Sequence, residues 1–200
     1  MISSYKEYCY YIECDRIASK RTRSFFDHTF ISLFLPTDLI WAFQKLLRLH
    51  EYHLNCKRGF LSLFTKYLVH YRFRVLSVRL GYTIPPNVFG PGLSIAHRGT
   101  IVINGNARIG SNCRIHIDVN IGAVGKSSQA PTIGNNVYIG PGAKIFGDIK
   151  IGNNTLIGAN AVVNKSFEEG NVVIGGVPAK VIGVPKVDDH LIRATEIIGK

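Results

Sequence analysis

The chain has 200 residues and a formal net charge of +11, and its hydrophobic residues, at 46%, are enough to form a buried core. The positive charge is spread along the chain with no nucleic-acid-binding motif beside it, so nucleic acid is not an expected partner. The four cysteines lack CxxC spacing, which argues against both a zinc site and a disulfide framework.

Residues 1–80 are predicted to form an N-terminal helical region. Thr37 is a candidate N-cap for one helix. The apolar side of that helix would carry Leu39, Phe43, Leu46, Leu47 and His50. A second helix is predicted from about Gly59 to Leu80, and Gly81 would end it.

The helical region holds thirteen Lys and Arg against six acids. Its most apolar stretch, Phe30 to Leu35, is too short to cross a bilayer, and no signal-peptide pattern opens the chain. We therefore expect a cytoplasmic protein whose basic, aromatic helices can make a peripheral membrane contact.

An aliphatic residue then returns at every sixth position, with one skip at Ser127. These positions are Ile103, Ile109, Ile115, Ile121, Ile133, Ile139, Ile145, Ile151, Ile157 and Val163. A period of six fits neither an amphipathic helix nor an alternating strand. It indicates a hexapeptide solenoid, in which three short parallel strands make one triangular coil. The predicted fold class is α+β, with the solenoid over residues 81–166 and a tail over 167–200.

The breaks in this pattern carry the candidate chemistry. His97 lies where the hexad phase slips, and it is two residues past an inward position when the count starts from Ile95 and Ile101. With eighteen residues per coil, Ile115 would stack over His97, and His116 would lie about 5 Å away along the solenoid axis. Two imidazoles are thus expected in one neighbourhood, where a histidine is well suited to act as a general base.

A family resemblance follows from these motifs. The segments that carry it are GLSIAHRGTIVINGNARIG, VNIGAVGKSSQAPTIGNNVYIGPGAKIFGDIKIG, IGANAVVNKSF and GGVPAKVIG, within residues 81–183. They resemble the serine O-acetyltransferase branch of the hexapeptide acyltransferases, and especially its members in polysaccharide and capsule biosynthesis. The resemblance implies a left-handed parallel β-helix that forms homotrimers and uses acetyl-CoA without a metal. It also implies that His97 is the general base in direct transfer to an acceptor hydroxyl.

The resemblance further implies which residues bind the co-substrate. The expected acetyl-CoA positions are Gly122, Ala123, Gly125, Lys126, Gly142, Ala143, Ala159, Lys165 and Lys180. Small residues permit close approach of the backbone, and lysines suit phosphates. His116 and Asp118 are further catalytic candidates, Asp118 because a carboxylate can orient an imidazole.

Two departures from the serine enzymes bear on the acceptor. Ala96 stands where those enzymes carry a carboxylate, and Gln129-Ala130 stands near their Arg-His pair. These losses favour a saccharide hydroxyl as acceptor, free or lipid-linked, with serine as the alternative. A γ-class carbonic anhydrase would need three histidines around zinc, and no third coil histidine is present. A non-enzymatic scaffold would bind no acetyl-CoA and would tolerate His97→Ala.

Overall fold

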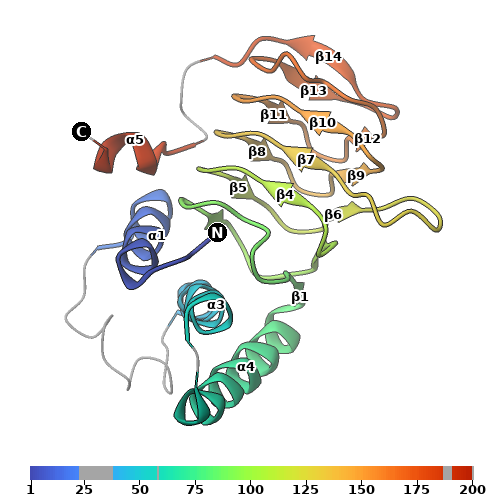
Figure 1. Ribbon diagram of the computed structural model, residues 1–200. Helices are drawn as coiled ribbons and strands as arrows, with labels where there is room; N and C mark the ends of the chain where they lie inside the picture. Colours follow the sequence, from blue (N-terminus) through green and yellow to red (C-terminus); the bar gives the residue numbers. More distant parts are fainter. Residues whose placement is uncertain (23–37, 58, 187–190, 200) are drawn as a thin grey trace.

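The computed structural model describes residues 1–22, 38–57, 59–186 and 191–199, and it places helices at one end of a stack of short strands (Figure 1). The helices are α1 (Tyr5–Ala18), α3 (Leu39–Asn55), α4 (Phe60–Leu80) and, after the strands, the short α5 (Ala194–Ile198). Both helices predicted between residues 37 and 80 are confirmed.

The ends of these helices follow their local sequence. Asp38 caps α3 by accepting a hydrogen bond from the Trp41 amide at 3.0 Å, whereas the predicted cap Thr37 lies outside the described residues. Gly81 ends α4 in the left-handed region at φ 78°, as predicted. The stretch from Phe30 to Leu35 also lies outside the described residues. Within the described part of the chain, no helix is long and apolar enough to span a bilayer.

The strands form three sheets, and each strand pairs in parallel with the strand one coil further on, except the antiparallel last pair. The five-stranded sheet contains β1 (Tyr82–Thr83), β3 (Ile101–Ile103), β6 (Val119–Gly122), β9 (Lys144–Phe146) and β12 (Val162–Val163). The three-stranded sheet contains β4 (Arg108–Ile109), β7 (Thr132–Ile133) and β10 (Lys150–Ile151). The six-stranded sheet contains β2 (Ser94–Ile95), β5 (Arg114–Ile115), β8 (Tyr138–Ile139), β11 (Leu156–Ile157), β13 (Val173–Gly175) and β14 (Lys180–Gly183).

The register shows how the hexad builds the core. Ile133 pairs with Ile151, eighteen residues on, so three hexads make one coil. Every aliphatic residue of the hexad series is at most 4% exposed, because its side chain points into the coil. Ile121 pairs with Ile145, twenty-four residues on, and the six extra residues form the loop around the skipped Ser127 (Figure 1).

Two expectations on the extent and phase of the coils need adjustment. Strands β13 and β14 continue the six-stranded sheet into the segment expected to be a tail. The first coil takes twenty residues, so Ile115 pairs with Ile95, and the expected stacking of Ile115 over His97 is wrong. The extra residues belong to the turn at His97, which leaves the hexad geometry before β3 begins.

An asparagine ladder runs along one corner of the solenoid, between the three-stranded and six-stranded sheets. Its members are Asn112, Asn136, Asn154 and Asn171, each with φ between 52° and 57°. The side-chain amide of each of the first three donates to the carbonyl oxygen of the next at 2.8 to 3.0 Å. Asparagine tolerates the left-handed backbone that this tight corner requires, and the ladder adds side-chain bonds between successive coils.

Candidate active site

The two candidate histidines meet at the corner that follows the six-stranded sheet. The ring centroids of His97 and His116 lie 5.8 Å apart, with 58° between the ring planes. His116 follows β5, and its ring lies 5.1 Å from that of Tyr138 on β8. The predicted shared neighbourhood is thus present, although it arises from the twenty-residue first coil and not from an eighteen-residue one.

Local contacts fix the turn that presents His97. The Tyr82 hydroxyl donates to the His97 carbonyl oxygen at 2.8 Å. Burial raises the pKa of Tyr82 to about 12, so this hydroxyl keeps its proton. Gly99 follows at φ 140°, a conformation that side chains rarely adopt, and the turn leaves the His97 side chain exposed to solvent.

His116 is the more enclosed of the two imidazoles. Its Nε2 atom is buried and has no hydrogen-bond partner among the residues that the structure describes. Burial lowers the pKa of His116, and the nearby charges of Arg114 and His97 lower it further. His116 is therefore neutral at physiological pH and can accept or donate a hydrogen bond to a bound molecule.

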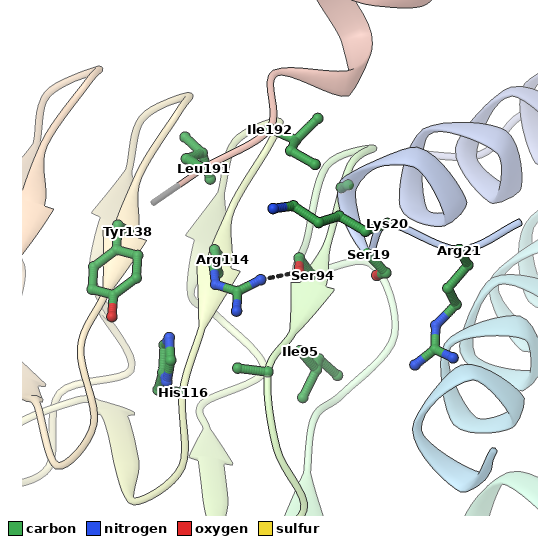
Figure 2. Close-up of a pocket in the computed structure, with 12 residues that line it drawn as sticks. Ser19, Lys20, Arg21, Ser94, Ile95, Arg114, His116, Tyr138, Leu191 and Ile192 are labelled. Atoms are coloured by element: carbon green, nitrogen blue, oxygen red, sulfur yellow. Dashed lines mark hydrogen bonds between the residues drawn. The ribbon is translucent and has the colours of Figure 1, made fainter. Parts of the chain in front are cut away.

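A cavity of about 460 Å³ adjoins His116 on the outer face of the six-stranded sheet. Figure 2 shows its floor, which is formed by outward side chains of three successive strands, including Ser94, Arg114 and Tyr138. Its walls come from Ala18 to Arg21, at and just after the end of α1, and from Leu191 and Ile192 ahead of α5. Sequence reasoning did not find these walls, because neither segment carries a motif.

Asp118 does not join the histidines. It lies exposed in the same turn as His116, just before β6, with φ 61°, and its backbone carbonyl oxygen accepts a hydrogen bond from the Lys144 ammonium group. No hydrogen bond links its carboxylate to His97 or His116 among the described residues. Those residues also include no group of three or more His, Cys, Asp or Glu side chains placed to hold a metal ion.

The expected acetyl-CoA positions fall on two corners of the coil. Gly142 and Ala159 follow strands of the six-stranded sheet, on the same corner as His97. Gly122 instead ends β6 of the five-stranded sheet, Ala123 to Lys126 follow it, and Lys165 follows β12 of the same sheet. Within one chain, the structure therefore does not bring the whole predicted set together.

The local environments of these residues differ. Gly122 packs beside the Phe146 ring, at 3.3 Å from where a Cβ would lie, whereas Gly125 has open space around it. The side chain of Ala143 is fully buried in the core, so only its backbone could face a ligand. The three lysines differ from one another in their neighbours: Lys126 lies exposed in the loop after β6, the Lys165 ammonium lies 5.4 Å from the Phe167 ring centroid, and Lys180 begins the edge strand β14.

The six-residue repeat, the parallel sheets and the N-terminal helices resemble those of the hexapeptide-repeat acyltransferases. Residues 130–165 match the family model described as bacterial transferase hexapeptide (six repeats).

Proteins similar to this chain in sequence include serine acetyltransferases. That of Synechococcus elongatus is 35% identical over 149 residues, which are 66% of this chain and 57% of the relative. That of Mycobacterium tuberculosis is 43% identical over 101 residues, which are 50% of this chain and 44% of the relative. The chain thus spans about half the length of the curated relatives it matches.

Solved structures extend the likeness through the helices. The serine acetyltransferase of Brucella abortus in complex with coenzyme A aligns with a TM-score of 0.69 and 28% identity, covering 91% of this chain and 70% of that chain. The enzyme from Vibrio cholerae aligns equally well, with a TM-score of 0.69 and 27% identity over 92% and 68% of the two chains. These relatives match the serine alternative better than the polysaccharide branch suggested by the sequence.

Proposed function

We propose that this chain is an acetyl-CoA-dependent O-acetyltransferase built on a left-handed β-helix, with His97 as its general base. The observation that carries the proposal is the His97 and His116 pair beside an open cavity. Its likeness to serine acetyltransferases, one of them solved with coenzyme A, supports acetyl-CoA as the donor.

The chemistry would proceed in one transfer. His97 takes the proton from the acceptor hydroxyl as its oxygen attacks the thioester carbonyl carbon, and the carbon–sulfur bond then breaks. The imidazolium returns the proton to the departing thiolate, so that the products are the acetyl ester and the free thiol. A positioned base of this kind supplies roughly 10² to 10⁴ in rate. Neutral His116 would hydrogen-bond the acceptor beside it.

Two acceptors are in competition. The relatives favour serine, which makes it the first acceptor to test. One structural observation favours a saccharide: Ala96 lines the cavity where a carboxylate is expected in the serine enzymes, and the described lining residues include no acid to pair with an amino acid's ammonium group. The cavity volume of about 460 Å³ also has room for a ligand much larger than serine.

We further propose that the complete site forms between subunits of a homotrimer. The histidines and the loop after β6 lie on different corners of one coil, so a neighbouring copy can bring its loop to these histidines. Gly122 and Lys126 would then lie beside the pantetheine arm, Gly142 and Ala159 along the groove, and Lys165 and Lys180 near the nucleotide. Light scattering should give a trimer mass, and a monomeric active enzyme would exclude this arrangement.

The test is a thiol-release assay with acetyl-CoA and a panel of serine, free sugars and nucleotide-linked or lipid-linked sugars. His97→Ala should lose at least about a hundredfold in kcat while still binding coenzyme A. His70→Ala, on α4 and away from the cavity, is the control and should keep its turnover. Near wild-type turnover in His97→Ala would remove His97 as the base.

The expected peripheral membrane contact has one candidate surface, the outer side of α4. Its exposed apolar residues are Leu63, Phe64, Tyr67, Tyr71, Val75 and Val78. This helix carries four basic residues and no acidic one, which complements an anionic lipid surface. Co-flotation with vesicles containing anionic lipid, abolished by Phe64→Ser with Tyr67→Ser, would support it. Self-association through α4 without flotation would contradict it.

A further inference from the structure

Two cations share the cavity beside His116. Figure 2 shows the ammonium group of Lys20 and the guanidinium group of Arg114 directed into the same part of it. Neither side chain forms an ion pair among the described residues. Arg21, a third cation in the wall, is already paired with Asp38 and points away from the other two.

Arg114 is held in position by the floor of the cavity. It lies half-buried on β5, and its Nη1 donates to the Ser94 hydroxyl oxygen on the neighbouring strand at 3.1 Å. This contact anchors one edge of the guanidinium group and leaves the rest available for a bound molecule. Guanidinium groups match carboxylate and phosphate oxygens in geometry and in charge.

Lys20 is held by the end of α1. The helix ends in a Schellman motif, in which the Lys20 amide donates to the Ile17 carbonyl and the Arg21 amide to the Arg16 carbonyl, both at 3.0 Å. Lys20 occupies the left-handed position of this motif, at φ 55°, where glycine is the usual residue. A lysine therefore stands at some conformational cost at a position of the turn that lines the cavity.

The described residues that line the cavity include no carboxylate to neutralise these two cations. Two like charges directed into one partly enclosed space repel each other unless an anion lies between them. Tyr138 and the unpartnered Nε2 of His116 line the adjacent wall, next to the candidate base His97. The cavity thus offers a cationic end and a histidine end.

We propose that Lys20 and Arg114 form an anion subsite that holds a phosphate or carboxylate group of the acceptor and so directs its hydroxyl to the histidines. This inference rests on the proposed acetyl transfer for the identity of the ligand as the acceptor, but not for anion binding itself. Serine would supply a carboxylate, whereas an activated sugar would supply a phosphate. A phosphorylated or carboxylated saccharide uses this site more fully, because it brings no ammonium group that would need an acid.

Three variants of the full chain test the subsite. Lys20→Gly relieves the left-handed backbone and should leave the thermal midpoint equal or higher, which separates binding from folding. Lys20→Gly and Arg114→Gln should each raise KM for an anionic acceptor about tenfold or more, with kcat and KM for acetyl-CoA little changed. Lys6→Gln, an exposed lysine in the first turn of the same helix, is the matched control and should have no effect.

Four acceptors are compared in this assay: serine, a hexose phosphate, a uronic acid and a neutral hexose. An increase in KM in the two variants that is confined to the charged acceptors supports the subsite. The charged acceptor with the highest kcat/KM identifies the source of the anion. Equal KM values for the wild type and both variants with every charged acceptor would overturn the proposal.

A binding measurement separates failure of the subsite from failure of the enzyme assignment. Inorganic phosphate, titrated with saturating coenzyme A present, should raise the thermal midpoint of the wild type and not that of the Lys20→Gly, Arg114→Gln double variant. This holds even if no acceptor is acetylated, which would refute only the proposed function. Equal stabilisation of both proteins by phosphate, or of neither, refutes the subsite.

Discussion

Arg48 and Asp15 form an ion pair in which both side chains are fully buried, with Arg48 Nε 2.8 Å from Asp15 Oδ2. Arg48 also donates to the carbonyl oxygens of Phe89 and Gly90 at 3.0 and 2.7 Å, and Asp15 Oδ1 accepts from the amides of Gly92 and Leu93 at 2.8 Å each. The pair thus ties α1 and α3 to the first coil. Asp15 lies in the last turn of α1, so the pair also holds in place the end of the helix that leads to Lys20.

Breaking this pair should unfold the helical end of the molecule. Arg48→Met leaves the Asp15 carboxylate buried without its partner, which costs about 3 to 5 kcal/mol in comparable buried pairs. Urea unfolding measures the loss, and the exposed Arg74→Met on α4 should change stability by no more than about 0.5 kcal/mol. Equal unfolding midpoints for Arg48→Met and the wild type would show that the pair contributes nothing.

The protonation of His116 should respond to Arg114. Burial is the first cause of its lowered pKa, followed by the charge of Arg114 and then that of His97. Arg114→Gln removes a positive charge that disfavours the imidazolium, so it should raise the pKa of His116, and His97→Asn should raise it less. An NMR titration of the His116 ring measures this, and an unmoved midpoint in Arg114→Gln contradicts the assignment.

Stability should fall in mild acid because of His50. Burial, together with His70 and His53, lowers the pKa of His50 to about 4, below the value of about 6.5 expected in the unfolded chain. The unfolded state therefore binds this proton first, so the contribution of His50 is complete above pH 6.5 and is lost as the pH falls towards 4. One such group changes the unfolding free energy by at most about 1.4 kcal/mol per pH unit.

His50→Phe removes the titrating group while keeping an aromatic ring against Phe73, which lies 5.2 Å away between ring centroids. Urea unfolding at a series of pH values between 7.5 and 4.5 should show a shallower decline for this variant than for the wild type. Parallel curves for the two proteins would assign the acid sensitivity to other groups.

The asparagine ladder should contribute to stability through both its backbone and its side chains. Asn136→Ala loses the bonds to Asn112 and Asn154, and at φ 57° it also lacks the polar side chain with which asparagine tolerates a left-handed backbone, a conformation that costs other residues roughly 1 to 2 kcal/mol. Asn136→Gly loses the same bonds without the strain and should be the less destabilised variant. Unfolding midpoints rank the two, and Asn164→Ala, exposed and outside the ladder, is the control.

The hexad pattern predicted the coils because every inward side chain is aliphatic or small, and these residues recur at a fixed spacing along the sequence. It also identified His97 and His116 as neighbours, since a histidine at a coil corner breaks the rhythm. It predicted the wrong length for the first coil. The length of the turn at Gly99 depends on its backbone conformation, which the spacing of hydrophobic residues does not show.

The rest of the site could not be read from the sequence, for physical reasons. Charged residues on a helix are usually exposed, so the sequence alone predicts Asp15 and Arg48 to lie at the surface. Their burial depends on the ion pair that they form with each other in the folded protein. Nothing in the sequence distinguishes Lys20 from the other lysines, because its direction depends on the turn that ends α1. The acid that caps α3, Asp38, lies next to an equally suitable threonine in the sequence.

The cavity wall joins residues from opposite ends of the chain, Ala18 to Arg21 and Leu191 to Ile192. Thr195 fastens the second segment to Asn112 by two hydrogen bonds at 2.7 and 3.1 Å, across 83 residues of sequence. Within the solenoid, in contrast, paired strands are separated by about one coil of sequence. Closing such a short loop costs less entropy. The solenoid should therefore take shape early in folding, and the acceptor cavity should be the last part of the molecule to assemble.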